Sequence, residues 1–158
     1  MKAYVSLPRT LSVGGWNMND SRCGRIDCGG KPAVVDMDRL AACNRNYRTV
    51  LWTGEYLQVT LMCIPVGGDV GAEVHCDTDQ LIRVESGCAL ALTGACRNQM
   101  NCRRKVTEGC AVIIPAGTWH NLVNIGNTPL KVCSVYAPPH HPSGTVQCTK
   151  RDAQCAGK

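Results

Sequence analysis

Short apolar runs, separated by connections that contain glycine and proline, fill residues 47–136 of this 158-residue chain. Runs of this length and composition are typical of β-strands, and the glycines and prolines between them mark turns. The predicted strands are residues 47–52, 57–64, 73–75, 80–84, 89–92, 105–106, 111–114, 120–124 and 130–136. Many short strands with closely spaced turns predict an all-β fold, as an antiparallel sandwich or barrel.

The rest of the chain is organised simply around this region. A length of 158 residues suits one domain with a core of its own. We expect an irregular N-terminal extension over residues 1–35, a barrel domain over residues 36–150 and a C-terminal tail over residues 151–158. Within the domain, residues 36–46 predict one short helix, with Asp36 or Asp38 as its N-cap.

The formal net charge of +5 is mild, and the basic residues are scattered apart from one run at residues 97–105 (RNQMNCRRK). That run holds no aromatic residue on which a base could stack, so we expect a solvated loop and no nucleic-acid partner. No segment approaches the length of a membrane span, and the opening residues lack the apolar stretch of a secretion signal. We therefore expect a cytoplasmic protein without a membrane partner.

Twelve cysteines are many for a chain of this size. No two of them are spaced as Cys-x2-Cys, which argues against a zinc knuckle or a thioredoxin-like redox centre. Cys63, Cys88, Cys110 and Cys133 lie in or beside apolar runs, where a thiol can serve as a small apolar side chain. We predict that most of the cysteines are reduced and help to pack the domain.

Two glycine-bounded segments carry polar residues in a spacing that favours one shared site. The first segment, residues 67–87, contains Glu73, His75 and Gln80. Glu73 and His75 are two residues apart, so on a strand their side chains leave the same face. The polar residues 77–79 predict a turn, after which Gln80 opens the returning strand and can reach the same point.

The second segment, residues 109–124, brings His120 toward this point from a distant strand. It fits the pattern G-x5-P-x-G-x2-H-x3-N, with its fixed positions at Gly109, Pro115, Gly117, His120 and Asn124. An isolated histidine on an apolar strand is more often a core residue than a ligand. Because the two segments share one consistent spacing, we interpret His75 and His120 as metal ligands.

Together, Glu73, His75, Gln80 and His120 offer one carboxylate, two imidazole nitrogens and one amide oxygen. This set suits one divalent metal ion, with Zn or Mn favoured and Fe or Ni as alternatives. It carries a single negative charge, so water or a substrate oxygen can complete the coordination. The neutral amide of Gln80 is the weakest of these ligands and could instead orient a bound water.

The two segments resemble the paired motifs of the cupin superfamily, in which the first motif is G-x5-H-x-H-x4-E-x6-G. Glu73 stands here in place of the first histidine, and Gln80 in place of the glutamate. The resemblance implies a double-stranded β-helix of jelly-roll type, with the metal inside the barrel and the mouth open at one end. It also implies a homodimer, because small cupins commonly pair through barrel faces and edge strands.

Within the cupins, residues 112–124 (VIIPAGTWHNLVN) and 135–145 (VYAPPHHPSGT) are similar to small proteins of the mannose-6-phosphate isomerase-like group. True phosphomannose isomerases hold zinc with the same donor types, a Gln, a Glu and two His. The order differs, because Glu73 comes early in this chain and Gln80 late. Those enzymes also have further domains and basic substrate-binding residues that have no evident counterpart here.

Three functional classes remain open from the sequence. The first is an isomerase-like metalloenzyme acting on a sugar or hydroxy-carbonyl substrate, in which His140, His141 or Tyr136 moves a proton. The alternative for the two adjacent histidines is a place in a proline-rich surface loop. The second class is an Fe- or Ni-dependent dioxygenase, for which two His and a carboxylate are a suitable ligand set. The third is a non-catalytic sugar or effector-binding module.

Overall fold

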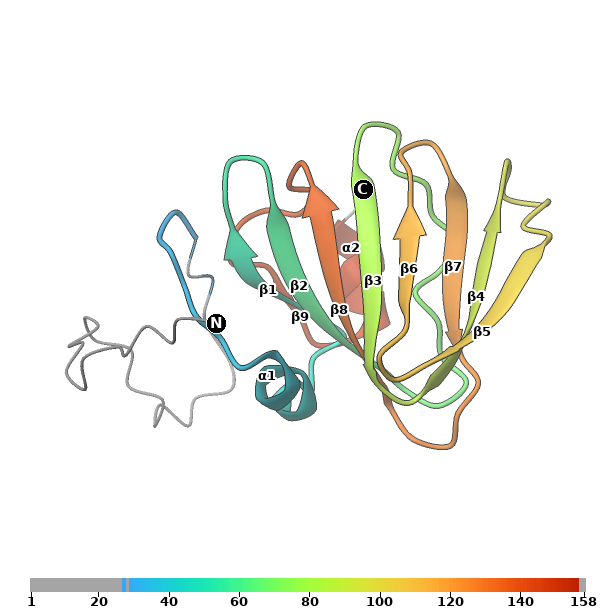
Figure 1. Ribbon diagram of the computed structural model, residues 1–158, viewed down its shortest axis with the longest axis horizontal. Coiled ribbons are helices and arrows are strands. Elements are labelled where there is room, and N and C mark those ends of the chain that lie inside the picture. Colours follow the sequence, from blue (N-terminus) through green and yellow to red (C-terminus); the bar gives the residue numbers. More distant parts are fainter. Residues whose placement is uncertain (1–26, 28, 157–158) are drawn as a thin grey trace, which may run out of the picture.

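The fold consists of two antiparallel sheets that enclose one core, in a computed structural model that describes residues 27 and 29–156 (Figure 1). The larger sheet has the strand order β6 (Ala111–Ile114), β3 (Asp79–Ser86), β8 (Leu130–Ala137), β2 (Gln58–Ile64), β1 (Arg48–Thr53) and β9 (Val146–Gln147). The smaller sheet has the order β5 (Cys102–Thr107), β4 (Cys88–Gly94) and β7 (Trp119–Asn124). This architecture confirms the predicted all-β sandwich.

The main core lies between the sheets and is built from alternate residues of each strand. On β2 and β8 the inward residues pair across the strands, so that Met62 lies opposite Val132 and Ile64 opposite Leu130. All four side chains are buried. The smaller sheet completes this core with Ala89, Ala91, Val106 and Leu122. Because strand residues alternate between faces, a single register places the whole set inside.

Helix α1 (Met37–Cys43) covers part of the outer face of the larger sheet. It begins at Asp36, whose side chain accepts a hydrogen bond of 3.0 Å from the backbone N–H of Arg39, as predicted for an N-cap. Ala41 of the helix packs on Leu61 and Cys133 in a second, smaller core. Apolar contacts from one face of α1 therefore attach the helix to the sheet.

The predicted strand 73–75 is wrong. Glu73 forms only an isolated antiparallel bridge with His120, and the neighbouring Asp69 forms another with Val123. Residues 65–78 therefore cross from the larger sheet to β7 of the smaller sheet, and the backbone partners they find there are scattered. From the sequence of three residues alone, an isolated backbone bridge cannot be distinguished from a continuous strand.

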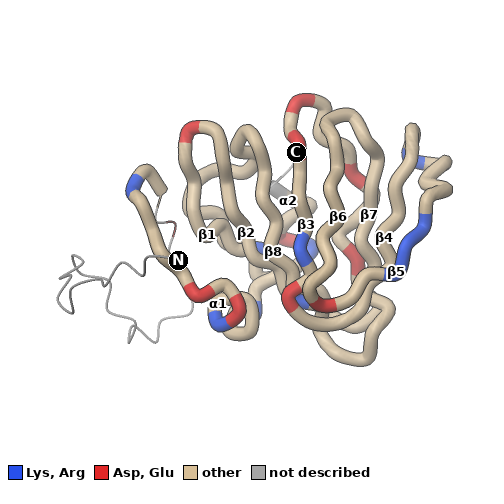
Figure 2. Tube along the Cα trace, in the orientation of Figure 1, with Lys and Arg blue, Asp and Glu red and all other residues tan. Residues whose placement is uncertain are grey.

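The basic run 97–105, expected as a loop, belongs in part to β5. Figure 2 shows that basic residues gather along this strand, which forms an edge of the smaller sheet. Arg103, Arg104 and Lys105 are exposed there. Charged side chains on an edge strand discourage pairing with a second sheet, which explains why a strand at this position is so polar.

A second helix, α2 (Lys150–Ala156), lies where the sequence analysis expected a C-terminal tail. Its Ala153 packs against the main core, and Lys150 forms an ion pair with Asp69 of the crossing segment. A single residue packed on the core, in a seven-residue helix of otherwise small and polar residues, is too weak a pattern to predict from sequence. Neither helix is long or apolar enough to span a membrane, and the described residues form no further helix that could do so.

The cysteines are free thiols at all ten positions that the structure describes, but few of them pack the interior. Of the four expected in the core, only Cys133 is buried, whereas Cys63 and Cys88 are half-buried and Cys110 is exposed. The packing interpretation is thus wrong for most of them. Cys110 lies in the tight turn before β6, where its backbone N–H donates to the carbonyl oxygen of Thr107. Cys23 and Cys28 lie outside the described residues.

Candidate metal centre

Glu73, His75 and His120 converge inside the barrel, as the spacing of the two segments predicted. Oε1 of Glu73 lies 3.5 Å from Nε2 of His75 and 3.3 Å from Nε2 of His120. One ligand atom from each residue lies within 4.8 Å of the other two. A triad of this size could hold a metal ion.

Backbone hydrogen bonds fix the positions of these three residues. The N–H of Glu73 donates to the carbonyl oxygen of His120 at 3.0 Å, and the N–H of His120 donates back at 2.9 Å. The carbonyl oxygen of His75 accepts a bond of 2.7 Å from the N–H of Gly117. Gly117 has a φ of +78°, which a residue with a side chain rarely adopts, so glycine is required for this turn. The two segments are therefore joined by their main chains.

The ring of His120 is oriented by a carbonyl group. Its Nδ1 atom lies 3.0 Å from the carbonyl oxygen of Thr118. Because a carbonyl oxygen can only accept, Nδ1 is the donor in this contact, which leaves Nε2 as the ring nitrogen that faces the triad. Metal-ligating histidines commonly have this arrangement, which fixes the tautomer and makes the ligating nitrogen more basic.

The three converging atoms are better suited to bind a cation than to form hydrogen bonds with one another. Oε1 of Glu73, Nε2 of His75 and Nε2 of His120 are buried, and within residues 27 and 29–156 none makes a well-formed hydrogen bond outside the triad itself. Burying such atoms unpaired costs about 1–3 kcal/mol each. Burial tends to raise the pKa of Glu73, but the two adjacent imidazoles outweigh it and hold this pKa at about 2. The carboxylate is therefore ionised, and two His with one carboxylate suit a divalent ion.

Gln80, the fourth predicted ligand, lies on β3 and faces the interior. Its side chain is buried, and its Oε1 atom has no hydrogen-bond partner in the described part of the chain. Across the sheet it lies opposite Tyr136, whose ring centroid is 5.7 Å from that of His75. The structure thus places the amide in the same interior as the triad, with an oxygen free to accept or to ligate.

The three residues predicted to move protons, His140, His141 and Tyr136, gather beside the triad. The ring centroid of His140 lies 4.0 Å from that of His75 and 4.9 Å from that of His141. Tyr136 lies 5.1 Å from His141, again between centroids. These contacts place the two histidine rings beside the triad, in a loop where His140 is still exposed and His141 is half-buried.

Gln58 holds the loop that carries both histidines, and the sequence analysis missed it. Its Nε2 donates to the carbonyl oxygen of His141 at 2.7 Å. Its Oε1 accepts from the backbone N–H groups of His141 at 2.9 Å and His140 at 3.3 Å. A buried amide on β2 thus binds the loop backbone on both its donor and acceptor sides. The available signal was a glutamine at an inward position of an apolar strand.

Burial favours the uncharged forms of Tyr136, His140 and His141. It raises the pKa of Tyr136, and the negative charge of Glu73 raises it further. Burial lowers the pKa of His140, and the nearby His75 adds to this effect. Burial also lowers the pKa of His141 to about 3. At neutral pH the site therefore presents a protonated phenol beside two neutral imidazoles.

Polar side chains deeper in the barrel were also missed by the sequence analysis. Oγ1 of Thr60, Oγ of Ser134 and the hydroxyl of Tyr136 are buried, and none makes a well-formed hydrogen bond to a described residue. Thr60 and Ser134 are directly opposite each other on β2 and β8. Both occupy inward positions of strands that are otherwise apolar. A polar residue in step with the inward positions of its strand was the sign of this cluster in the sequence.

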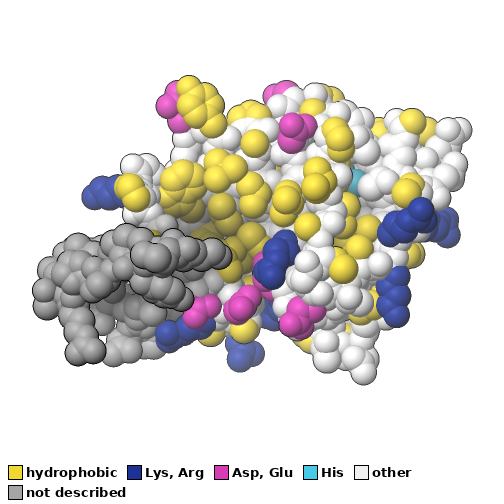
Figure 3. Space-filling view, in the orientation of Figure 1, with side chains coloured by type: hydrophobic (Ala, Val, Ile, Leu, Met, Phe, Trp, Pro, Cys, Tyr) yellow, Lys and Arg dark blue, Asp and Glu magenta, His cyan; other side chains and the backbone are white. Residues whose placement is uncertain are grey.

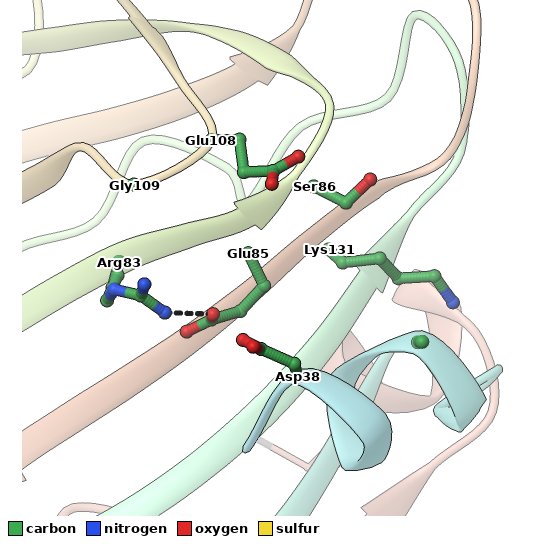
Figure 4. Close-up of a pocket in the computed structure, with 8 residues that line it drawn as sticks. Asp38, Arg83, Glu85, Ser86, Glu108, Gly109 and Lys131 are labelled. Atoms are coloured by element: carbon green, nitrogen blue, oxygen red, sulfur yellow. Dashed lines mark hydrogen bonds and ion pairs between the residues drawn. The ribbon is translucent and has the colours of Figure 1, made fainter. Parts of the chain in front are cut away.

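A separate pocket of about 390 Å³ opens on the outer side of the larger sheet (Figure 4). Its charged lining combines Asp38 of α1 with Glu85 of β3, Glu108 and Lys131. Arg83 and Glu85 form an ion pair at its wall. None of the triad residues lines this pocket, so it is distinct from the metal centre.

Comparison with known proteins agrees with this geometry. The family model described as the cupin domain matches residues 60–136, a range that contains the whole triad. The uncharacterized protein YrkC of Bacillus subtilis (strain 168) is 48% identical over 130 residues, which cover 82% of this chain and 70% of that protein. The uncharacterized protein L612 of Acanthamoeba polyphaga mimivirus is 37% identical over 125 residues, covering 78% of this chain and 76% of that one.

A solved structure extends the likeness to three dimensions. The crystal structure of BH2720 from Bacillus halodurans superimposes with a TM-score of 0.81 at 48% sequence identity. The match covers 82% of this chain and 98% of that chain. Sequence and fold thus agree across most of the described residues, and the chain belongs to the cupin family.

Proposed function

We propose that this cupin is a metal-dependent, isomerase-like enzyme that acts on a sugar or hydroxy-carbonyl substrate. Glu73, His75 and His120 would hold one divalent ion, Zn or Mn rather than Fe or Ni, with Gln80 as fourth ligand. The observation that carries the proposal is the position of neutral His140, whose ring lies 4.0 Å from that of His75. This position supports His140 as a proton acceptor beside the proposed metal ligands.

The side chains divide the work according to their charge states. A bound divalent ion supplies a Lewis acid that polarises a carbonyl oxygen of the substrate. Neutral His140 accepts the proton from the hydroxyl-bearing carbon next to that carbonyl and returns it to the carbonyl carbon, while the hydroxyl proton passes to the former carbonyl oxygen. Tyr136 keeps its proton at neutral pH, because burial raises its pKa, and donates a hydrogen bond to the substrate. Gln58 holds the backbone of His140 in place.

Proton exchange with solvent tests this proposal. The metal-loaded protein is incubated anaerobically in D₂O with a panel of sugar phosphates, free aldoses, β-diketones and thiols, and deuterium at substrate carbons is measured by NMR. We expect incorporation next to a carbonyl, and its loss in His140→Gln with metal content unchanged. Incorporation that is undiminished in His140→Gln would contradict the assigned base.

Oxygen chemistry is the second candidate, and the composition of the triad favours it. The histidine and acidic residues that converge are two His and one Glu, a set that leaves coordination positions free if Gln80 does not ligate. An oxygen electrode distinguishes the two activities, because a dioxygenase consumes oxygen only with substrate and a redox-active ion. Full metal content with silence in both assays would instead favour a non-catalytic sugar or effector-binding module.

We also propose that the chain forms a homodimer through the outer face of the larger sheet. Figure 3 shows hydrophobic side chains gathered over these strands. One apolar row crosses five strands in register, made of Ile113, Leu81, Val135, Val59 and Trp52. A second copy would present the same uncharged row, so the two faces would match each other.

Light scattering checks this assembly. Ile113 is 76% exposed on β6, and Ile113→Lys should convert a dimer to monomers because it introduces a charge into the row. Ile125→Lys is the matched control, since Ile125 is 48% exposed and follows β7 of the other sheet. A monomeric wild-type chain, or a dimer that survives Ile113→Lys, would contradict the proposed face.

A further inference from the structure

Arg48 is a buried basic residue that the metal centre does not use. It is the first residue of β1, and its register partners are Met62 on β2 and Gln147 on β9. Met62 and the next inward residue of β1, Val50, belong to the buried interior. Arg48 itself is only 6% exposed, so its guanidinium points into the barrel rather than to solvent.

The guanidinium has few partners for a buried charge. Nη1 donates to Oε1 of Gln147 at 3.0 Å, and Cζ lies 5.7 Å from the ring centroid of Tyr47. Nε is buried and has no hydrogen-bond partner in the described chain. Among residues 27 and 29–156, no carboxylate forms an ion pair with Arg48. An isolated charge inside a protein is costly unless something compensates it.

The geometry of the group indicates what could compensate it. A guanidinium presents its N–H donors as a planar fork that matches the two oxygens of a carboxylate or phosphate. Nη1 is directed at Gln147, which leaves the edge that carries Nε available for such a pair. A neutral ligand would satisfy the donors without balancing the charge.

The same interior also contains hydroxyl groups that lack partners. Oγ1 of Thr60, Oγ of Ser134 and the hydroxyl of Tyr136 are buried beside one another, make no well-formed hydrogen bond to the rest of the described chain, and can turn to donate to a ligand oxygen. Thr60 is the register partner of Val50, two residues along β1 from Arg48, and Ser134 lies opposite Thr60. The unpaired donors therefore extend across β1, β2 and β8 on one inner face.

Arg48 acts electrostatically on the residues beside the triad. Burial lowers the pKa of His141, and the charge of Arg48 is the next largest cause. Glu73 of the triad also influences His141, in the opposite direction. With a divalent ion bound, Glu73 would be the acidic group of the triad opposing three positive charges. The interior would then carry an excess of positive charge.

We infer that Arg48 binds an anionic group, a carboxylate or phosphate, of the small molecule that enters the barrel. The hydroxyls of Thr60, Ser134 and Tyr136 donate to the remaining oxygens of that molecule. The identification of this molecule as a substrate rests on the proposed function, whereas the anion subsite itself requires no catalysis. The substrates thus selected from the sugar and hydroxy-carbonyl class are the acidic ones.

Titration calorimetry on the full chain tests this subsite with inorganic phosphate, acetate and the neutral probe glycerol. We expect the wild type to bind phosphate or acetate in preference to glycerol, with metal loaded and also after chelation. Arg48→Met removes the charge at similar volume and should weaken anion binding roughly tenfold or more, as expected for loss of a charge-assisted pair. Arg104→Met, on the exposed edge strand, should leave it unchanged.

Several outcomes overturn the inference. Equal anion binding by wild type and Arg48→Met does so, as does equal weakening by Arg104→Met or binding that disappears on chelation alone. Arg48→Lys keeps the charge but not the fork, and should weaken acetate more than phosphate. If Arg48→Met does not fold, undiminished acetate binding by Arg48→Lys is decisive against the subsite.

The inference and the proposed function can fail separately. An absence of deuterium exchange on every substrate, together with anion binding that depends on Arg48, would reject only the enzyme. Exchange on sugar phosphates at equal rates in wild type and Arg48→Met would reject only the anionic substrate. Metal content measured in each variant excludes an indirect effect through the triad.

Discussion

The two ends of the barrel interior differ in chemistry although the same strands build both. Along β2 and β8 the inward pairs run from Gln58 with Tyr136 and Thr60 with Ser134 to Met62 with Val132 and Ile64 with Leu130. The first two pairs are polar and the last two are apolar. The inward side chains of each strand therefore change from polar to apolar halfway along, while the pairing register stays constant.

The difference shows how one sheet can serve two purposes. The apolar end removes hydrocarbon from water and supplies stability. The polar end leaves buried oxygens of Thr60, Ser134 and Tyr136 without partners among the described residues, at a cost in stability. Such a cost is common at functional sites, where groups are positioned for a ligand rather than for each other.

The largest expected effect separates metal binding from folding. His120→Ala removes one of the converging donors, so metal affinity should fall by orders of magnitude while the apolar end keeps the barrel folded. Metal titration and circular dichroism measure the two properties. His141→Ala is the matched control, because His141 is not part of the triad, and it should retain metal. Stoichiometric metal at unchanged affinity in His120→Ala would remove this residue from the centre.

A substitution at the apolar end should show the reverse pattern. Met62 is buried in the main core, so Met62→Ala leaves a cavity and should lower the free energy of unfolding by about 2–5 kcal/mol. Metal stoichiometry of the folded protein should not change. Denaturant unfolding and metal analysis check both statements. A Met62→Ala protein that is fully stable but binds little metal would contradict this separation of roles between the two ends.

Acidification should destabilise the polar end. Burial lowers the pKa of His141 to about 3 from an ordinary value of 6.5, so between these values the unfolded chain binds more protons than the folded one. The free energy of unfolding of the metal-free protein should therefore decrease as pH falls through this window. His141→Gln should show a shallower decrease between pH 7 and pH 4. Identical slopes in the two proteins would show that His141 is solvated.

The smallest effect expected concerns the unpaired hydroxyls. Thr60→Val keeps the shape of a fully buried side chain and removes an oxygen that has no partner in the described structure. Stability should stay the same or rise by about 1 kcal/mol, whereas Val50→Thr at the neighbouring inward position should be destabilising. Urea unfolding measures both variants. A clear loss of stability in Thr60→Val would indicate that its hydroxyl is hydrogen-bonded, to the neighbouring Tyr136 hydroxyl or to a buried water.

Sequence was sufficient for the apolar strands of the sheets, because alternation and turn residues repeat over many positions, but it missed most of β5 and all of β9. Residues 57–64 and 130–136 were predicted within one residue of β2 and β8. The segment 73–75 failed because its pairing depends on a single bridge to a strand far along the chain. Helix α2 was missed because little of its surface is apolar.

The candidate site could be predicted as far as spacing defines it. Glu73, His75 and His120 are fixed by short intervals within two segments, and they converge as expected. Gln58 and Arg48 could not be assigned roles, because each acts through contacts with residues more than eighty positions away. A polar residue at an inward position is visible in sequence, but its partner is visible only in three dimensions.

The reciprocal main-chain bonds between Glu73 and His120 have an evolutionary consequence. Peptide groups make these bonds, so the two positions stay adjacent whatever side chains they carry. A glutamate occupies position 73 here where the related motif has a histidine, and the frame that holds it does not depend on that exchange. Donor types can thus be swapped by single substitutions without rebuilding the scaffold. The set of donors offered to a metal ion can therefore change while the backbone stays the same.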